Sequence, residues 1–147
     1  MTMKQMSYHL VNLEQRALDL RDSGRLDEAV ELFARIVKEQ PDWEHGMGFY
    51  NLAGCYEDLG RFELAEQSYD AALQCEPGNT IFLGGLASFL YLHGEPEKAF
   101  EAHLRLLKLE KMARHVSDVE SLKIPLQALG KKIGLSETEV ADRINSM

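Results

Sequence analysis

The residues of this 147-residue chain that could do chemistry are five histidines and two cysteines. The histidines are His9, His45, His93, His103 and His115. None is spaced as in H-E-x-x-H, and Cys55 and Cys75 form no C-x-x-C pair, so the usual zinc-ligand patterns are missing. Gly46-Met47-Gly48 lacks the third glycine of a nucleotide loop, and no G-x-S-x-G pattern occurs. We expect no catalytic, cofactor or metal residues and predict that the chain is not an enzyme.

The two cysteines and the distribution of apolar residues favour a protein of a reducing compartment. Cys55 and Cys75 fall far apart on two successive predicted helices, so we expect no bridge and two buried or half-buried thiols. No apolar run approaches the roughly 18–20 residues of a membrane helix. Residues 1–9 lack the apolar core of a secretory signal. We therefore expect a cytoplasmic protein without a membrane partner.

The net charge of −8 is unevenly distributed. Residues 1–97 carry 17 acidic and 7 basic side chains, whereas residues 98–147 carry 7 acidic and 9 basic ones. Phosphate binding needs clustered Lys and Arg, so we expect no nucleic-acid partner. The gradient itself is equally typical of a solvated surface.

A repeated pattern indicates the elements that position any functional residues. Gly24, Gly60 and Gly94 each precede an alanine by five residues, and a ring follows each alanine by four. The alanines are Ala29, Ala65 and Ala99, and the rings are Phe33, Tyr69 and His103. The copies are 36 and 34 residues apart, which is typical of stacked helical hairpins.

The middle copy shows the pattern most completely. It consists of Phe49, Leu52, Ala53, Tyr56, Gly60, Ala65, Tyr69 and Pro77. This series resembles the tetratricopeptide repeat. The first copy has Arg16 where Leu is expected, and the third has Lys111 in place of the closing Pro. The resemblance covers about residues 10–113 and implies an all-α, right-handed helical solenoid of three hairpins.

We expect one domain over residues 1–147. Its repeats would span about 10–43, 46–79 and 80–113, followed by a C-terminal helical cap over 114–147. The two extra residues between the first two repeats fall near Trp43, which we expect to hold the loop against the stack. Contact of Trp43 with a partner is the alternative.

The resemblance also implies where a partner lies, because in this family the first helix of each hairpin lines a concave surface. The matching positions are Val11, Glu14, Gln15, Leu18, Arg21, Asp22, Met47, Tyr50, Asn51, Gly54, Glu57, Asp58, Ile81, Gly84, Gly85, Ser88, Tyr91 and Leu92. From these we select the candidate partner-binding residues Glu14, Met47, Tyr50, Asn51, Glu57, Asp58, Ser88 and Tyr91.

The carboxylates of this set favour a basic or amide-rich partner. Tyr50, Tyr91 and Met47 offer apolar contact area, and Asn51 can both donate to and accept from a peptide backbone. Gly84 and Gly85 are unusual inside a helix. They indicate either a close approach by a partner or a frayed helix start after Pro77.

One functional subclass of the family is excluded by its residues. Cochaperone members grip a chaperone's terminal carboxylate with Lys, Asn and Arg at set positions. Those positions here are Glu14, Leu18, Asn51, Ile81 and Gly85, and only Asn51 agrees with the pattern.

The C-terminal segment does not continue the repeat pattern. Ser117 with Glu120 and Ser136 with Glu139 are typical capping boxes, so we expect two helices, with a kink or break at Pro125. These helices would bury the open face of the last repeat. Residues 129–144 also resemble a helix-turn-helix, although their acidic residues disfavour DNA.

Together these features predict a protein-protein interaction module, in an adaptor or chaperone-like role, that binds a peptide or protein segment in the repeat groove. The alternatives are self-association of two copies, a bacterial secretion chaperone, and a DNA-binding regulator acting through residues 129–144.

Overall fold

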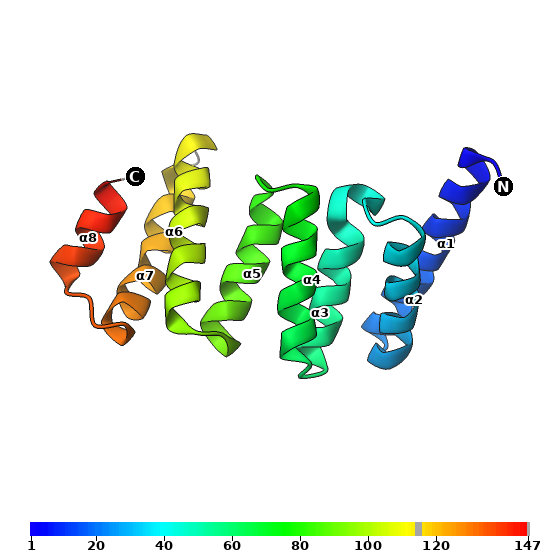
Figure 1. Cartoon of the computed structure of the whole chain (residues 1–147), viewed down its shortest axis with the longest axis horizontal. Coiled ribbons are helices and arrows are strands. Elements are labelled where there is room, and N and C mark those ends of the chain that lie inside the picture. Colours follow the sequence, from blue (N-terminus) through cyan, green and yellow to red (C-terminus); the bar gives the residue numbers. More distant parts are fainter. Residues whose placement is uncertain (114–115, 147) are drawn as a thin grey trace. The chain divides into compact units, whose positions relative to one another are not determined.

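The computed structural model of the chain describes residues 1–113 and 116–146, with the side chains of 116–119 also left out. The part described consists of helices, with no strand (Figure 1). In chain order these are α1 (Met3–Asp22), α2 (Leu26–Glu39), the short 3₁₀ helix η1 (Trp43–Gly46), α3 (Met47–Asp58), α4 (Phe62–Cys75), α5 (Thr80–His93), α6 (Pro96–Ala113), α7 (Val116–Lys132) and α8 (Glu137–Asn145). The predicted all-α class is confirmed.

The helices pair into hairpins through glycine turns. Gly24, Gly60 and Gly134 have φ of +79°, +73° and +83°, the left-handed region in which glycine carries no side-chain penalty. At all three turns the next residue's amide donates to the carbonyl five residues earlier, at 2.8 Å. The Gly94 turn differs, because its φ is −98°. The C-terminal hairpin α7–α8 therefore uses the same turn as α1–α2 and α3–α4.

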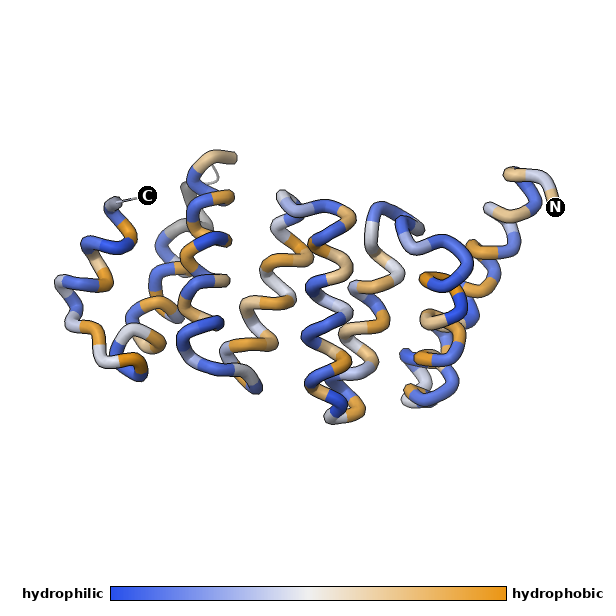
Figure 2. The backbone as a smooth tube through the Cα atoms, viewed as in Figure 1, coloured by the Kyte–Doolittle hydropathy of each residue, from blue (hydrophilic) through white to orange (hydrophobic). Residues whose placement is uncertain are grey.

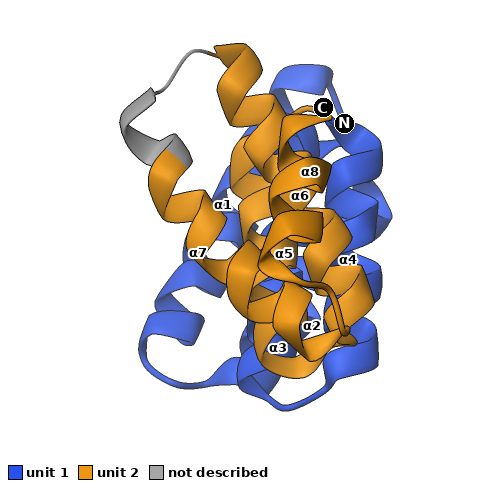
Figure 3. Ribbon diagram, turned by 90° about the vertical axis from the view of Figure 1, so that its left-hand side faces the viewer, with its two compact units in different colours: residues 1–77 blue, residues 78–147 orange. Residues whose placement is uncertain are grey.

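The chain divides into two compact units (Figure 3). Unit 1 comprises residues 1–77, in which α1 packs on α2, α2 on α3, and α3 on α4. Unit 2 comprises residues 78–147, in which α5 packs on α6, α6 on α7, and α7 on α8. Each unit has its own apolar core, and the single-domain assignment stays a prediction.

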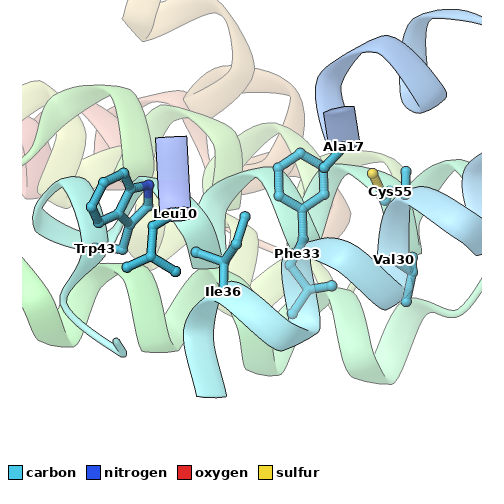
Figure 4. Close-up of a cluster of buried hydrophobic side chains, with 9 residues drawn as sticks. Leu10, Ala17, Val30, Phe33, Ile36, Trp43 and Cys55 are labelled. Carbon is cyan, nitrogen blue, oxygen red and sulfur yellow. The ribbon is translucent and has the colours of Figure 1, made fainter. Parts of the chain in front are cut away.

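The cores explain the repeat residues. Ala29, Ala65 and Ala99 have no exposed surface, as expected where two helices cross closely. In unit 1 the buried cluster contains Leu10, Ala17, Ala29, Val30, Phe33, Ile36, Trp43, Leu52 and Cys55 (Figure 4). Trp43 is 6% exposed, so the prediction that it holds the loop against the stack is confirmed.

The loop that carries the two extra residues is strained. Glu44 and His45 lie in the left-handed region, with φ of +48° and +55°, and Gly46 follows at +107°. Such a conformation costs a non-glycine residue of the order of 1–3 kcal/mol. Burial of the neighbouring Trp43 provides apolar contacts that offset this cost.

The C-terminal hairpin differs from expectation at Pro125. Of the predicted kink or break, the break is wrong, because helix α7 continues through this proline. The kink stays a prediction. Leu126 and Leu129 beyond it are fully buried, and this packing outweighs the local cost of the missing amide. The Ser136–Glu139 capping box is confirmed, with bonds of 2.7 and 3.1 Å. Ser117 lies among the side chains outside the described part.

Three further expectations can be compared with the structure. Helix α5 begins at Thr80 and the Asn79 side chain accepts from two of its amides, so the frayed start at Gly84 is wrong. Cys55 is buried as predicted, but Cys75 at the end of α4 is exposed, so that half of the thiol prediction is wrong. The helices that the structure describes include none long and apolar enough to cross a membrane.

Candidate functional site

The first helices of the hairpins hold the predicted site residues in two separate groups. Unit 1 carries Glu14 on α1 and Met47, Tyr50, Asn51, Glu57 and Asp58 on α3. All of these are half-buried except Asp58, which is exposed. Unit 2 carries Ser88 and Tyr91 on α5, and both are exposed.

In unit 1 a polar contact joins the two first helices. Arg21 on α1 donates from Nη1 to Asn51 Oδ1 on α3 at 3.3 Å, and its Nε lies 3.4 Å from Asp22. We call the surface formed by Glu14, Arg21, Tyr50, Asn51 and Glu57 the α1–α3 face. Arg21 fixes the Asn51 amide there. Arg21 is one of the groove positions of the sequence analysis, but it was not selected as a candidate partner-binding residue. Arg21 and Asn51 are 30 positions apart in the chain, and this offset was the sequence signal for their contact.

Glu57 is engaged inside the hairpin. The Tyr69 hydroxyl of α4 donates to Glu57 Oε2 at 2.8 Å, and the Tyr50 ring meets the Tyr69 ring edge-on at 5.8 Å between centroids. Burial raises the pKa of Tyr69 well above its usual range, and the adjacent Glu57 carboxylate adds a smaller effect in the same direction. Tyr69 thus stays a donor, and Glu57 contributes a positioned acceptor rather than a fully solvated charge.

Glu14 lies beside the strained loop. Burial raises the pKa of Glu14, the Trp43 indole lowers it, and the Glu44 carboxylate raises it. The Trp43 indole nitrogen is buried and lacks a partner in hydrogen-bonding geometry among the described residues. The half-buried Glu14 carboxylate and the buried Trp43 indole therefore lie near each other at the same end of unit 1.

In unit 2 Tyr91 lies between two other helices. Its ring meets the buried His103 ring of α6 edge-on at 6.1 Å, and the Lys132 ammonium of α7 lies 5.6 Å from its centroid. Sequence reasoning did not place α7 in the site, because its spacing departs from the repeat. The glycine at position 134, which follows α7 as Gly24 and Gly60 follow the first helices of the earlier hairpins, could have indicated that α7 is a first helix too.

His103 is a buried polar group whose ring nitrogens make no well-formed hydrogen bond to the described residues. It is 7% exposed. Burial lowers the pKa of His103, while the Ala87 carbonyl pulls it upward. The third ring of the repeat is thus a buried packing residue, and its imidazole is neutral at pH 7.

A groove of about 770 Å³ runs between α7 and α8. Its lining includes the apolar residues Leu135, Val140 and Ile144 and the basic residues Lys123 and Lys131. Lys123 is paired with Glu120 at 2.7 Å. Neither this groove nor any other described part of the chain gathers three or more His, Cys, Asp or Glu side chains as a metal site would.

The comparisons with known proteins agree with this architecture. Residues 15–80 match the family model of the tetratricopeptide repeat. Together with the repeat pattern and the hairpins described above, this match identifies residues 15–80 as tetratricopeptide repeats.

Two solved structures illustrate the fold. The Yersinia enterocolitica type III secretion chaperone SycD, in complex with a peptide of the translocator YopD, is 21% identical with a TM-score of 0.71. The match covers 85% of this chain and 95% of that one. The TPR2B domain of yeast Sti1, in complex with pHsp70, is 15% identical with a TM-score of 0.71. The match covers 84% of this chain and 97% of the Sti1 chain. At these identities the likeness concerns the fold alone.

Among curated proteins, the chain is 30% identical over 99 residues to the transcription factor tau subunit sfc4 of Schizosaccharomyces pombe. The match covers 67% of this chain and 9% of sfc4. The chain thus spans about a tenth of the length of this relative.

Proposed function

We propose that this chain is a non-catalytic protein-interaction module that binds a peptide or protein segment on the first helices of its hairpins, in an adaptor or chaperone-like role. The observation that carries the proposal is the α1–α3 face. There Arg21 holds the Asn51 amide in place across two helices, so a backbone-binding group is positioned before any partner arrives.

The related proteins support a polypeptide partner. SycD is described in complex with a translocator peptide, and the Sti1 domain in complex with pHsp70. The protein sfc4 is named as a subunit, a role in which one chain contacts others. The free thiols Cys55 and Cys75 are compatible with the cytoplasmic location that we propose.

Charge supports a basic or amide-rich partner for unit 1. Residues 1–77 carry 15 acidic and 7 basic side chains, a net charge of −8. Such a field speeds the approach of a cationic segment and disfavours an anionic one. It also argues against the carboxylate grip of the cochaperone subclass, since Glu14 would face the ligand's negative charge.

The alternatives remain distinguishable. A secretion chaperone is supported by the extent of the SycD match. Self-association is supported by the apolar residues Met3, Tyr8 and Val11, which are exposed on α1. DNA binding through residues 129–144 is disfavoured further, because Arg143 is paired with Glu101 at 2.6 Å and so is already engaged.

The test is a pull-down from native lysate with the full chain, comparing wild type with Arg21→Ala/Asn51→Ala. The matched control is Asp27→Ala/Arg61→Ala, which removes an exposed pair of 3.0 Å between α2 and the start of α4. We expect a prey retained by wild type and the control but lost by the face variant. Preys unaffected by the face variant, with unchanged helical circular dichroism, would overturn the proposal.

A further inference from the structure

Unit 2 presents a second face, built from α5 and α7. Helix α5 carries three residues spaced four and three positions apart, namely Gly84, Ser88 and Tyr91. Helix α7 carries three residues spaced three and four positions apart, namely Pro125, Ala128 and Lys132. Such spacings place side chains on one side of a helix. The Lys132 ammonium over the Tyr91 ring brings the two sides together. We call these six residues the α5–α7 face.

The face carries one charge, and that charge is positive. Helix α5 contains no carboxylate from Thr80 to His93, and its residues are mainly hydrophobic (Figure 2). Within the described part of the chain, no carboxylate pairs with Lys132. Its contact is instead the exposed Tyr91 ring. An ammonium without a counter-ion beside an apolar surface favours a partner that carries a carboxylate.

The face also has room for a side chain. Glycine is among the least favourable residues inside a helix, and Gly84 lies in the interior of α5. A Cβ at Gly84 would meet nothing within 4 Å in the described structure. By contrast, a Cβ at Gly48 would lie 3.0 Å from Val37, and one at Gly130 would overlap Val140. Packing explains those two glycines, whereas Gly84 leaves an open position on α5.

We propose that the α5–α7 face binds a partner segment carrying an acidic and an aliphatic side chain about 10 Å apart. The carboxylate would lie at Lys132, and the aliphatic side chain above Gly84. Gly84 and Tyr91 are seven residues apart, which is about 10.5 Å along a helix. An extended peptide covers that distance in three residues, so the motif is an acidic and an aliphatic residue three positions apart.

This inference rests on the proposed function and adds a partner chemistry opposite in charge to that of unit 1. It is tested by selecting a phage-displayed library of random dodecapeptides on the immobilised full chain. Parallel selections use Lys132→Glu and the matched control Lys131→Glu, which makes the same charge change on the adjacent residue in the α7–α8 groove. We expect the acidic–aliphatic motif on wild type and control, and at least tenfold weaker binding of these peptides to Lys132→Glu.

A second variant separates binding from folding. Gly84→Leu fills the open position, so we expect it to lose the aliphatic preference while its thermal midpoint stays the same or rises. Enriched peptides that bind Lys132→Glu as well as wild type would overturn the inference.

Other outcomes distinguish the two proposals. Peptides lost by Arg21→Ala/Asn51→Ala but not by Lys132→Glu would overturn this inference and leave the proposed function standing. A library without any enriched peptide would overturn both. A concentration-dependent mass in sedimentation that Lys132→Glu abolishes would assign the face to a second copy of the chain and overturn the inference.

Discussion

The α1–α3 face of unit 1 and the α5–α7 face of unit 2 are both built from the first helices of helical hairpins, yet their polar groups behave differently. In unit 1 they satisfy one another, as Arg21 does for Asn51 and Tyr69 for Glu57. In unit 2 Lys132 lies over an aromatic ring instead. Residues 78–147 carry 9 acidic and 9 basic side chains, against the net −8 of unit 1. The repeat fixes the backbone, and the side chains decide the ligand chemistry.

The same contrast recurs at one position of the repeat. Tyr69 and His103 follow their alanines, Ala65 and Ala99, at the same distance, and both rings are buried. Tyr69 donates to Glu57, whereas the ring nitrogens of His103 make no well-formed hydrogen bond to the described residues. The ring is therefore needed for its volume, and its polar atoms are free to differ between units.

The largest effect is expected where unit 2 has no space. Gly130→Ala would place a Cβ on Val140 Cγ2 and separate α8 from α7. Overpacking of this kind typically costs about 1–3 kcal/mol. Urea unfolding followed by circular dichroism measures the loss, and a variant as stable as wild type would show that α8 contributes little to unit 2.

The two ring positions should respond with opposite signs. Tyr69→Phe removes the bond to Glu57 and should lower the free energy of unfolding by about 1 kcal/mol. His103→Phe removes buried nitrogens that make no well-formed hydrogen bond and should raise it by a similar amount. The free energies of unfolding are measured with urea at pH 7.5. A change of the same sign in both variants would contradict the contrast between the units.

The His103 variant should also change the pH dependence. Because the pKa of His103 is lowered from 6.5, its contribution to stability is present above pH 6.5 and is lost as the pH falls through the folded-state value. We expect His103→Phe to remove this decline between pH 7 and 5, measured as the thermal midpoint of wild type against variant.

Gly84→Ala should be smaller in effect and stabilising. The position is open, so replacing glycine in the helix interior should gain up to about 1 kcal/mol. Thermal unfolding checks the sign, with Gly54→Ala on α3 as the matched variant, since that position is open as well. A loss of stability at position 84 would mean that the site is not open.

The smallest effect is expected at Glu14. Its raised pKa means that its contribution to stability is present below pH 4.5 and is lost as the pH rises through the folded-state value. Glu14→Gln should therefore gain a few tenths of a kcal/mol at pH 7, with the difference vanishing near pH 4. A variant less stable at pH 7 would contradict the burial cost assigned to Glu14.

The sequence predicted those features that repeat. A glycine, an alanine and a ring recur in register, as Gly60, Ala65 and Tyr69 do in the middle copy. Stacked helices therefore followed from the spacing, and their pairing into hairpins from the resemblance to the tetratricopeptide repeat. The break at Pro125 and the burial of Cys75 were predicted wrongly, because tertiary packing rather than local preference decides whether a helix continues and which side of it is covered. Lys132 was missed since its contact with Tyr91 joins helices whose spacing departs from the repeat.

The hairpins have a kinetic consequence. Within each unit, every helix packs mainly on its neighbours in the chain, so native contacts close short loops. Folding rates of small domains increase as contacting residues become closer in sequence. Both units should therefore reach the native state in milliseconds or less after dilution from denaturant, on the order of the rates seen for helical bundles.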